Sequence, residues 1–127
     1  MEREGHLTLH LIPAARWEAW SAAAAASADP AAQYTPAGFA DDGFVHCTDG
    51  DEAMLAVANR FYAGDPQPFV VLDLDLALVG APWRYDDPGA VYPHVYGPLR
   101  RVAVRGVRPV RRDAAGRFVG YGERGPA

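Results

Sequence analysis

Residues 69–75, Phe69-Val-Val-Leu-Asp-Leu-Asp75, form the clearest strand signal in the sequence. Phenylalanine and valine, which are enriched in strands, dominate the run together with leucine. Because successive side chains of a strand point to opposite faces, Asp73 and Asp75 are expected on the same face. We therefore expect a fold built on a sheet, and we interpret the neighbouring segments around it.

The flanking sequence predicts two helices and several more strands. In residues 6–12, three leucines alternate with Thr8 and His10, as in a strand. An alanine-rich helix is expected from residue 14 to about residue 26, and a helix with one apolar stripe from about residue 49 to residue 63. The other expected strands cover 43–48, 83–85, 99–110 with a bulge at Gly106, and 118–121 after a turn at 113–116, with loops at 27–42 and 86–98. The expected fold class is α+β: two main helices packed on a mostly antiparallel, split sheet of five to six strands.

Length and composition are those of an ordinary globular protein. The chain has 127 residues, of which 50% are hydrophobic and 22% charged, and we treat it as a single domain (1–127) with its core in 6–121. No apolar run approaches the roughly 18 residues that a membrane helix needs, and the charged stretch 1–6 does not resemble a secretory signal. A lone cysteine, Cys47, cannot form an internal disulfide, so we expect a cytoplasmic protein with no membrane association.

The basic residues restrict the chemistry further. The sequence contains no lysine, so all twelve basic residues are arginine, and Schiff-base chemistry and a lysine-containing phosphate loop are excluded. The net charge of −4 argues against nucleic acid as a partner. Residues 100–127 nevertheless carry eight arginines and two acidic residues. This excess predicts either a solvated strand face with a basic tail or an edge that faces an anion.

Histidines carry most of the candidate chemistry. His10, His46 and His94 fall in expected strands or in the stiff loop 86–98, where a site can be held rigidly. His6 is expected to be solvated. Imidazole donates, accepts or exchanges a proton near pH 7. For each histidine alone, a purely structural role is the alternative.

Nucleophilic and metal chemistry are the other hypotheses for these residues. In an extended strand, His46 and Thr48 share one face and Cys47 lies on the other, so Cys47 is expected in the core and not as a nucleophile. A metal site could combine the three histidines with Asp73 or Asp86. Because no pair of histidines has local ligand spacing, no metal is expected.

Several short motifs together carry a family resemblance. They are His10-Leu-Ile-Pro13 before a tryptophan-containing helix, Gly43-Phe-Val-His-Cys-Thr48 followed by Val57-Ala-Asn-Arg-Phe-Tyr62, and Tyr92-Pro-His-Val-Tyr-Gly-Pro-Leu99. In this combination they resemble the bacterial and plant family called domain of unknown function 952. The resemblance covers about residues 6–110. It implies a shared fold but no accepted reaction.

More distantly, the same positions resemble the ADP-ribosyltransferase fold, especially the RNA 2′-phosphotransferases. In that fold a histidine on the first strand is followed by a strand of the pattern apolar-His-apolar-Ser/Thr. His10 matches the first position, and His46 with Thr48 matches the second. The resemblance implies an ADP-ribosyltransferase-like fold with NAD as its cofactor. It further implies that His10 holds a ribose hydroxyl, that His46 holds a phosphate or ribose oxygen, and that Tyr62 stacks on a base or a nicotinamide ring.

Our leading hypothesis is a small enzyme, transferase-like, with one histidine-lined cleft for a nucleotide or ribose-phosphate-like small molecule. The expected catalytic residues are His10, His46 and His94, and the expected ligand-binding residues are Thr48, Arg60, Tyr62, Tyr85, Asp86 and Tyr96. One alternative is a cofactor-independent enzyme in which His46 and His94 act as acid and base in an elimination, cyclisation or isomerisation. Another is a non-catalytic module that binds a nucleotide or a peptide. The sequence leaves the substrate, the oligomeric state and the use of NAD open.

Overall fold

A computed structural model describes residues 6–27, 33–36, 38–87 and 89–126. Over these residues the fold is α+β, with three α-helices and strands that pair only antiparallel. None of the helices in these ranges is both long and apolar enough to cross a membrane.

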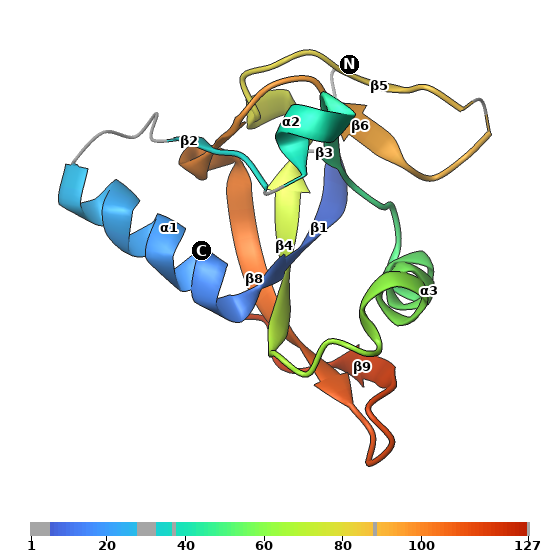
Figure 1. The fold of residues 1–127 in the computed structure, drawn as a ribbon. Helices are drawn as coiled ribbons and strands as arrows, with labels where there is room; N and C mark the ends of the chain where they lie inside the picture. Colours follow the sequence, from blue (N-terminus) through green and yellow to red (C-terminus); the bar gives the residue numbers. More distant parts are fainter. Residues whose placement is uncertain (1–5, 28–32, 37, 88, 127) are drawn as a thin grey trace.

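The elements form one larger and two smaller sheets (Figure 1). The helices are α1 (Ala14–Ser27), α2 (Phe39–Asp42) and α3 (Asp51–Tyr62). The strands are β1 (Leu7–Pro13), β2 (Gln33–Tyr34), β3 (Val45–His46), β4 (Phe69–Asp75), β5 (Trp83–Tyr85), β6 (Pro93–Val95), β7 (Leu99–Arg100), β8 (Val104–Arg112) and β9 (Phe118–Tyr121). The sheet orders are β1-β4-β8-β9, β2-β7 and β3-β6-β5.

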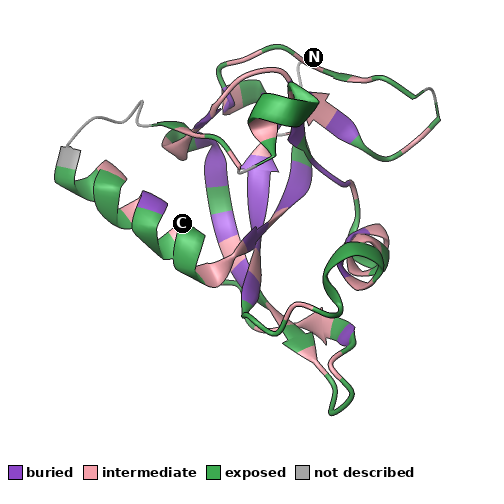
Figure 2. Ribbon diagram, in the orientation of Figure 1, coloured by how far each residue is buried: buried purple, intermediate pink, exposed green. Residues whose placement is uncertain are grey.

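Strand β4 lies between β1 and β8, and both of its faces are covered (Figures 1 and 2). On one face, Leu72 packs in a cluster with Ile12 of β1 and Trp20 of α1. On the other face, Val71 packs with Leu9 of β1 and Met54 of α3. This two-sided burial explains why 69–75 is an almost continuous apolar run and not a simple alternation of apolar and polar residues.

The longer predicted elements are confirmed, and several short ones correct the prediction. Strands 69–75, 83–85 and 118–121 have the predicted bounds, and both main helices lie where they were expected. The expected loops contain α2, β2 and β6, and the expected strand 99–110 is divided by a 3₁₀ turn at Arg101–Ala103. The described strands form one sheet of four strands and two smaller sheets, in place of the predicted split sheet of five to six strands. Strands of two or three residues are too short to show a hydrophobic period.

The predicted irregularity at Gly106 is present. Asp73 of β4 pairs with Gly106, but Leu74 pairs with Val104, so Arg105 is the extra residue of a bulge. A Cβ atom at Gly106 would lie 2.8 Å from Oδ2 of Asp73. Glycine is therefore needed here because a buried carboxylate approaches the backbone closely.

The start of α3 has no capping side chain. The N-cap residue is Gly50, and no side chain caps the helix. Asp49 instead accepts hydrogen bonds from Thr8 Oγ1 at 2.6 Å and from the Tyr85 hydroxyl at 2.5 Å. Burial, followed by the contact with Asp49, raises the pKa of Tyr85, which keeps the hydroxyl protonated as a donor.

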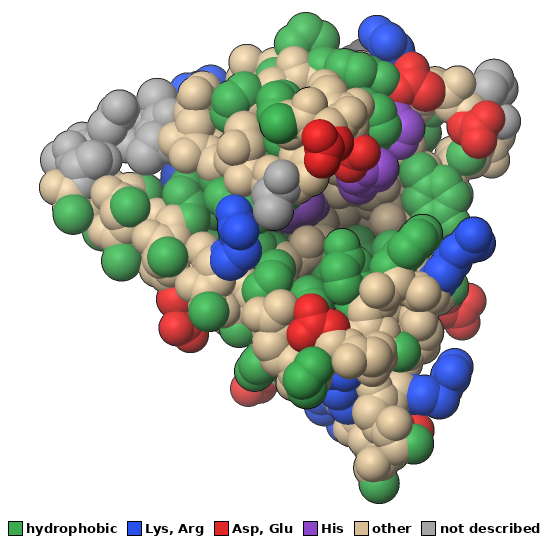
Figure 3. Space-filling model, viewed as in Figure 1, with side chains coloured by type: hydrophobic (Ala, Val, Ile, Leu, Met, Phe, Trp, Pro, Cys, Tyr) green, Lys and Arg blue, Asp and Glu red, His purple; other side chains and the backbone are tan. Residues whose placement is uncertain are grey.

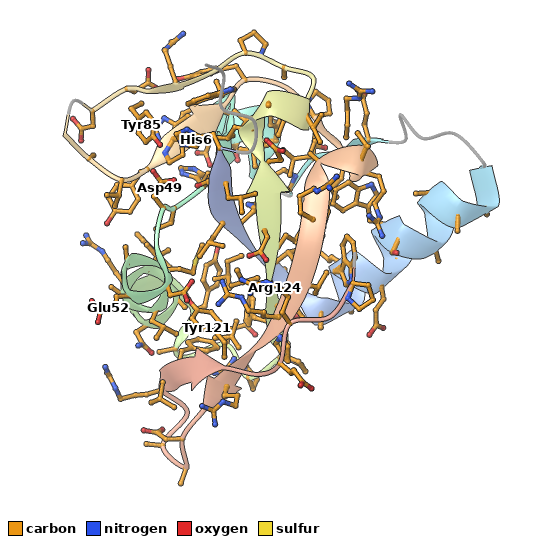
Figure 4. All side chains as sticks on the ribbon, turned by 180° about the vertical axis from the view of Figure 1, so that it is seen from behind. His6, Asp49, Glu52, Tyr85, Tyr121 and Arg124 are labelled. Carbon is orange, nitrogen blue, oxygen red and sulfur yellow. The ribbon has the colours of Figure 1, made fainter. Side chains whose placement is uncertain are left out.

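His6 joins the cluster of Thr8, Asp49 and Tyr85 (Figure 4). The sequence predicted a solvated side chain at this position, and that prediction is wrong. His6 is half-buried, its Nε2 lies 3.0 Å from the Tyr85 hydroxyl, and its ring packs 5.1 Å from that of Trp83. The start of β1 is thereby attached to β5.

The arginine-rich segment agrees only in part with the sequence interpretations. Arg108 is buried, and its two Nη atoms donate to the carboxylate of Asp51 at 3.0 and 2.9 Å. Its guanidinium lies 4.4 Å from the ring centroid of Tyr121. Arg124, near the end of the described chain, donates from Nε to Asp73, which is buried on β4 (Figure 4). Arg108 and Arg124 therefore pair with carboxylates, whereas Arg105, Arg111 and Arg117 are exposed, as a solvated face predicts.

We predict that Arg124→Ala lowers the free energy of unfolding by about 1–3 kcal/mol, because the buried carboxylate of Asp73 loses a charged donor. Chemical denaturation measures the change. Arg117→Ala is the matched control, since Arg117 is exposed, and it should cost less than about 0.5 kcal/mol. Equal losses in the two variants would show that Arg124 does not stabilise Asp73.

Candidate functional site

A cavity of about 960 Å³ opens between β1, α3 and the segment that leads from β2 to β3. Figure 3 shows this face of the molecule, with histidine side chains beside the hollow and acidic side chains next to them. The polar residues that line it include His10, Arg16, Asp42, His46, Thr48, Arg60, Asp65 and Gln67, and the aromatic residues are Tyr34, Phe61, Tyr62, Phe69 and Tyr92. The cavity is large enough for a nucleotide-sized molecule.

His10 is the most constrained polar group of the cavity. It lies on β1, only 5% exposed, and its Nδ1 is 2.8 Å from the carbonyl oxygen of His46. A carbonyl only accepts, so Nδ1 carries the proton and the neutral ring presents Nε2 as an acceptor. Nε2 is buried and has no hydrogen-bond partner among the described residues. Burial lowers the pKa of His10 to about 4, so the ring is neutral at pH 7.

His46 lies beside His10 but faces outward. Its Nε2 lies 2.9 Å from Oδ2 of Asp42, the last residue of α2. The neighbouring Cys47 is buried, as the alternation of the strand predicted, and burial raises the pKa of its thiol. A thiol that stays protonated is a poor nucleophile. Thr48 is buried and lines the cavity.

Two arginines and several aromatic rings surround the opening. The Cζ atom of Arg16 lies 5.7 Å from the ring centroid of Tyr34, and Cζ of Arg60 lies 5.3 Å from that of Phe61. The Phe61 side chain is exposed, and Tyr62 beside it is partly exposed at the same opening. The rim therefore combines positive charge with flat apolar surface.

The carboxylates of the cavity already have partners. Asp42 is bound to His46, and both Oδ atoms of Asp65 accept hydrogen bonds from Gln67, one from the backbone and one from the side chain. Arg16 and Arg60 are therefore the charged groups available for an anionic ligand.

The fold separates the residues that were predicted to line a single cleft into two groups. His10, His46, Thr48, Arg60 and Tyr62 line the cavity. The other predicted residues, His94, Tyr85, Asp86 and Tyr96, do not line it.

His94 lies just outside the cavity, directly opposite His46 on the neighbouring strand, with 5.6 Å between the two ring centroids. Its Nδ1 is 2.7 Å from Oδ2 of Asp86, which also accepts from the hydroxyl of Tyr96. Tyr85 points to the opposite face of β5, where it bonds to Asp49. Strand alternation therefore separates Tyr85 from the predicted site.

Sequence reasoning missed several residues of the cavity wall. Arg16 was not assigned a role, and Tyr34 and Asp42 fell in an expected loop. Phe61 and Tyr92 were quoted only as parts of motifs. A helical wheel could have placed Phe61 beside Tyr62, but no sequence pattern brings Tyr34 or Asp42 to the histidines.

The hypothesis of a metal site that combines these histidines with Asp73 gains no support from the geometry. Within the described ranges, no group of three or more His, Cys, Asp or Glu side chains is arranged to hold a metal ion. Asp73 lies on the α3 side of the central sheet, where it bonds to Arg124 and Arg108.

Comparisons with known proteins identify a family and a shared fold. The family model described as protein of unknown function (DUF952) matches residues 11–107, which confirms the resemblance drawn from the motifs. No curated protein matches the sequence significantly.

The chain is also similar to solved structures of protein CC0527 from Caulobacter crescentus, a structural-genomics target. Two crystal structures, one of a double mutant, have TM-scores of 0.66 and 0.65 at 25% identity, covering 89% of this chain and 93% of that chain. The solution NMR structure has a TM-score of 0.63 at 25% identity, covering 87% of this chain and 89% of that one.

The neutral state of His10 predicts a pH dependence of stability. Its pKa is 6.5 in the unfolded chain and about 4 in the folded one, so between these values the unfolded state binds more protons. The free energy of unfolding should therefore rise with pH over this window, by up to about 3 kcal/mol from this group. Urea denaturation between about pH 4 and pH 7 measures the slope, which should be smaller in His10→Gln.

A measurement on the wild type tests the same point without a variant. In an NMR titration, the imidazole of His10 should keep the chemical shifts of the neutral ring down to about pH 5. A midpoint near the ordinary histidine value would contradict the neutral assignment.

Proposed function

This chain belongs to the DUF952 family of proteins of unknown function, and we propose that it is a small enzyme whose cavity takes a nucleotide or another ribose-phosphate-like molecule. The observation that carries the proposal is the buried, unpartnered Nε2 of His10. A buried acceptor without a donor is costly, by about 1–3 kcal/mol. A ligand hydroxyl that donates to Nε2 removes this cost.

The rest of the cavity wall suits the other parts of such a ligand. Arg16 and Arg60 line the cavity and can hold phosphate oxygens through charged hydrogen bonds. Phe61, Tyr62 and Tyr92 line it as well and offer ring faces for a base. A sugar hydroxyl, an anion and a flat ring are the three parts of a nucleotide, and the cavity has a partner for each.

The more specific part of the proposal is that the protein has an ADP-ribosyltransferase-like fold, has a transferase-like activity and acts in the cytoplasm. Its support is that His10 on the first strand and His46 with Thr48, the positions that carry the resemblance, line one cavity. NAD fits this donor set: a ribose hydroxyl on His10, a phosphate or ribose oxygen on His46, and a ring on Tyr62. When bound, NAD would supply an ADP-ribosyl group for transfer.

Calorimetric titration of NAD, ADP-ribose and AMP tests the proposal. We expect saturable binding of at least one of them by the wild type. His10→Gln, His46→Ala and Arg60→Ala should each weaken binding about tenfold, the value of one hydrogen bond or charge-assisted contact. His6→Gln is the control, because His6 lies in the Tyr85 cluster and not in the cavity.

Each variant should first be shown to be folded by its thermal melt. Absence of binding by the folded wild type would refute the nucleotide proposal. Binding without turnover of any ribose-phosphate compound would identify the protein as a binding module and not an enzyme.

A further inference from the structure

Three functional side chains form a straight row across the small sheet β3-β6-β5. His46 of β3 pairs directly with His94 of β6, and His94 pairs directly with Arg84 of β5. Residues directly opposite one another in antiparallel strands point to the same face. Next to the two histidines in β3 and β6, Val45 and Val95 point to the opposite face and are fully buried. We call these three residues the His46–His94–Arg84 row.

Each imidazole of the row has one nitrogen bound to a carboxylate. Nε2 of His46 donates to Asp42 at 2.9 Å, and Nδ1 of His94 donates to Asp86 at 2.7 Å. In the neutral rings, Nδ1 of His46 and Nε2 of His94 are therefore unprotonated. A carboxylate behind an imidazole orients the ring and stabilises its protonated form during proton transfer. Each ring is thus prepared to gain and lose a proton at its other nitrogen.

Neighbouring aromatic rings hold the row in place. Phe44 stacks on His94 with 3.9 Å between centroids and an interplanar angle of 15°, and it lies 4.7 Å from the ring of His46. Arg84 donates from Nε to Asp86 at 2.6 Å, and its Cζ lies 4.3 Å from the ring centroid of Tyr96. These two contacts orient the guanidinium of Arg84, whose side chain is largely exposed.

We propose that the His46–His94–Arg84 row is a site for in-line displacement at the phosphorus of a ribose phosphodiester. This inference rests on the proposed function, because the ribose must lie in the adjacent cavity beside His10. His46 lines that cavity whereas His94 lies outside it. His46 is therefore assigned as the general base on the attacking oxygen and His94 as the general acid on the leaving oxygen. Arg84 binds a non-bridging phosphate oxygen.

The proposed step balances atoms and charge. Nδ1 of His46 takes the proton from the attacking oxygen as that oxygen forms its bond to phosphorus. The bond from phosphorus to the leaving oxygen breaks, and its electron pair stays on that oxygen. His94, protonated at Nε2 beforehand, gives this proton to the leaving oxygen. The two rings then exchange protons with solvent, and no electron transfer is involved.

The same chemistry has two substrate forms, which differ in the attacking oxygen. In a linear diester, the ribose 2′-hydroxyl attacks and a 2′,3′-cyclic phosphate forms. In a 2′,3′-cyclic phosphate, water attacks in line with the 2′-oxygen and a nucleoside monophosphate forms. Because the ribose keeps its place, His94 then takes the proton from the water and His46 gives a proton to the leaving 2′-oxygen. Both place phosphorus between a base and an acid, as the row requires.

The experiment uses three probes on the whole chain: the dinucleotide adenylyl-adenosine, its 2′-deoxy analogue, and adenosine 2′,3′-cyclic phosphate. Binding is measured by calorimetry and products by chromatography. We expect turnover of the dinucleotide or of the cyclic phosphate, and none of the deoxy analogue. His46→Gln and His94→Gln should each lose about 10²- to 10⁴-fold in kcat with binding changed by less than about tenfold.

Further variants separate catalysis from folding and from contaminating nuclease. Arg84→Ala should reduce turnover more than Arg84→Lys, which keeps a positive charge. Arg117→Ala, purified in the same way, should keep the full rate. A rate that is unchanged in His94→Gln would assign the turnover to a contaminant and overturn the inference.

The pH profile tests the carboxylates as positioning residues. The wild type should give a bell-shaped profile of kcat. Asp42→Asn should alter one limb and Asp86→Asn the other, whereas a merely structural role would lower the rate equally at every pH. Among the described residues, the charged and titratable groups that face the two rings are His10, Asp42, Arg84, Asp86 and Tyr96.

The outcomes distinguish the two proposals. Binding of a probe without turnover would overturn the phosphodiester inference and leave the proposed function standing. If no probe and no nucleotide binds, the proposed function fails and the inference fails with it.

Discussion

The junction between β1 and the segment after β3 is the constraint on which the site depends. Leu9 of β1 and Thr48, two residues after the end of β3, exchange two backbone hydrogen bonds, at 3.0 and 2.8 Å. One residue further along β1, the ring of His10 donates to the carbonyl oxygen of His46. These bonds fix the distance between the central sheet and the small sheet. They also fix the tautomer of His10, because a carbonyl only accepts.

The consequences of this junction extend to both parts of the site. It turns Nε2 of His10 into a buried acceptor next to the cavity. It also places the ring of His46 at the border of the cavity and, across the small sheet, opposite His94. A binding cavity and a row of acid–base groups thus share one residue. This sharing is the physical basis for treating binding and chemistry as parts of one site.

The charged residues show a second principle, the compensation of buried charge. Two acidic residues of the first 99 residues pair with arginines of the basic last 28 residues. Arg108 bonds to Asp51, and Arg124 bonds to Asp73, both pairs joining distant parts of the chain. A buried carboxylate without such a partner would be costly. Part of the uneven charge of the sequence is therefore compensated by pairing within the fold.

Local patterns in the sequence determined the long elements and the direction of some side chains. The apolar run 69–75 forms the central strand, the alanine-rich stretch forms α1, and alternation correctly placed Cys47 in the core with His46 outside. These features depend on neighbours in the chain, and their periods of 2 or 3.6 residues are visible in the sequence. The family was recognisable for the same reason, since its motifs are contiguous.

Only the tertiary structure decided which residues meet. It removed Tyr85 from the predicted cleft, brought Asp42 to His46 from an expected loop, and aligned Arg84 with His94. Strand register and the packing of short elements set these contacts, and both depend on residues far apart in the chain. A two-residue strand such as β3 has no period of its own, so its partners are chosen by the core that forms around it.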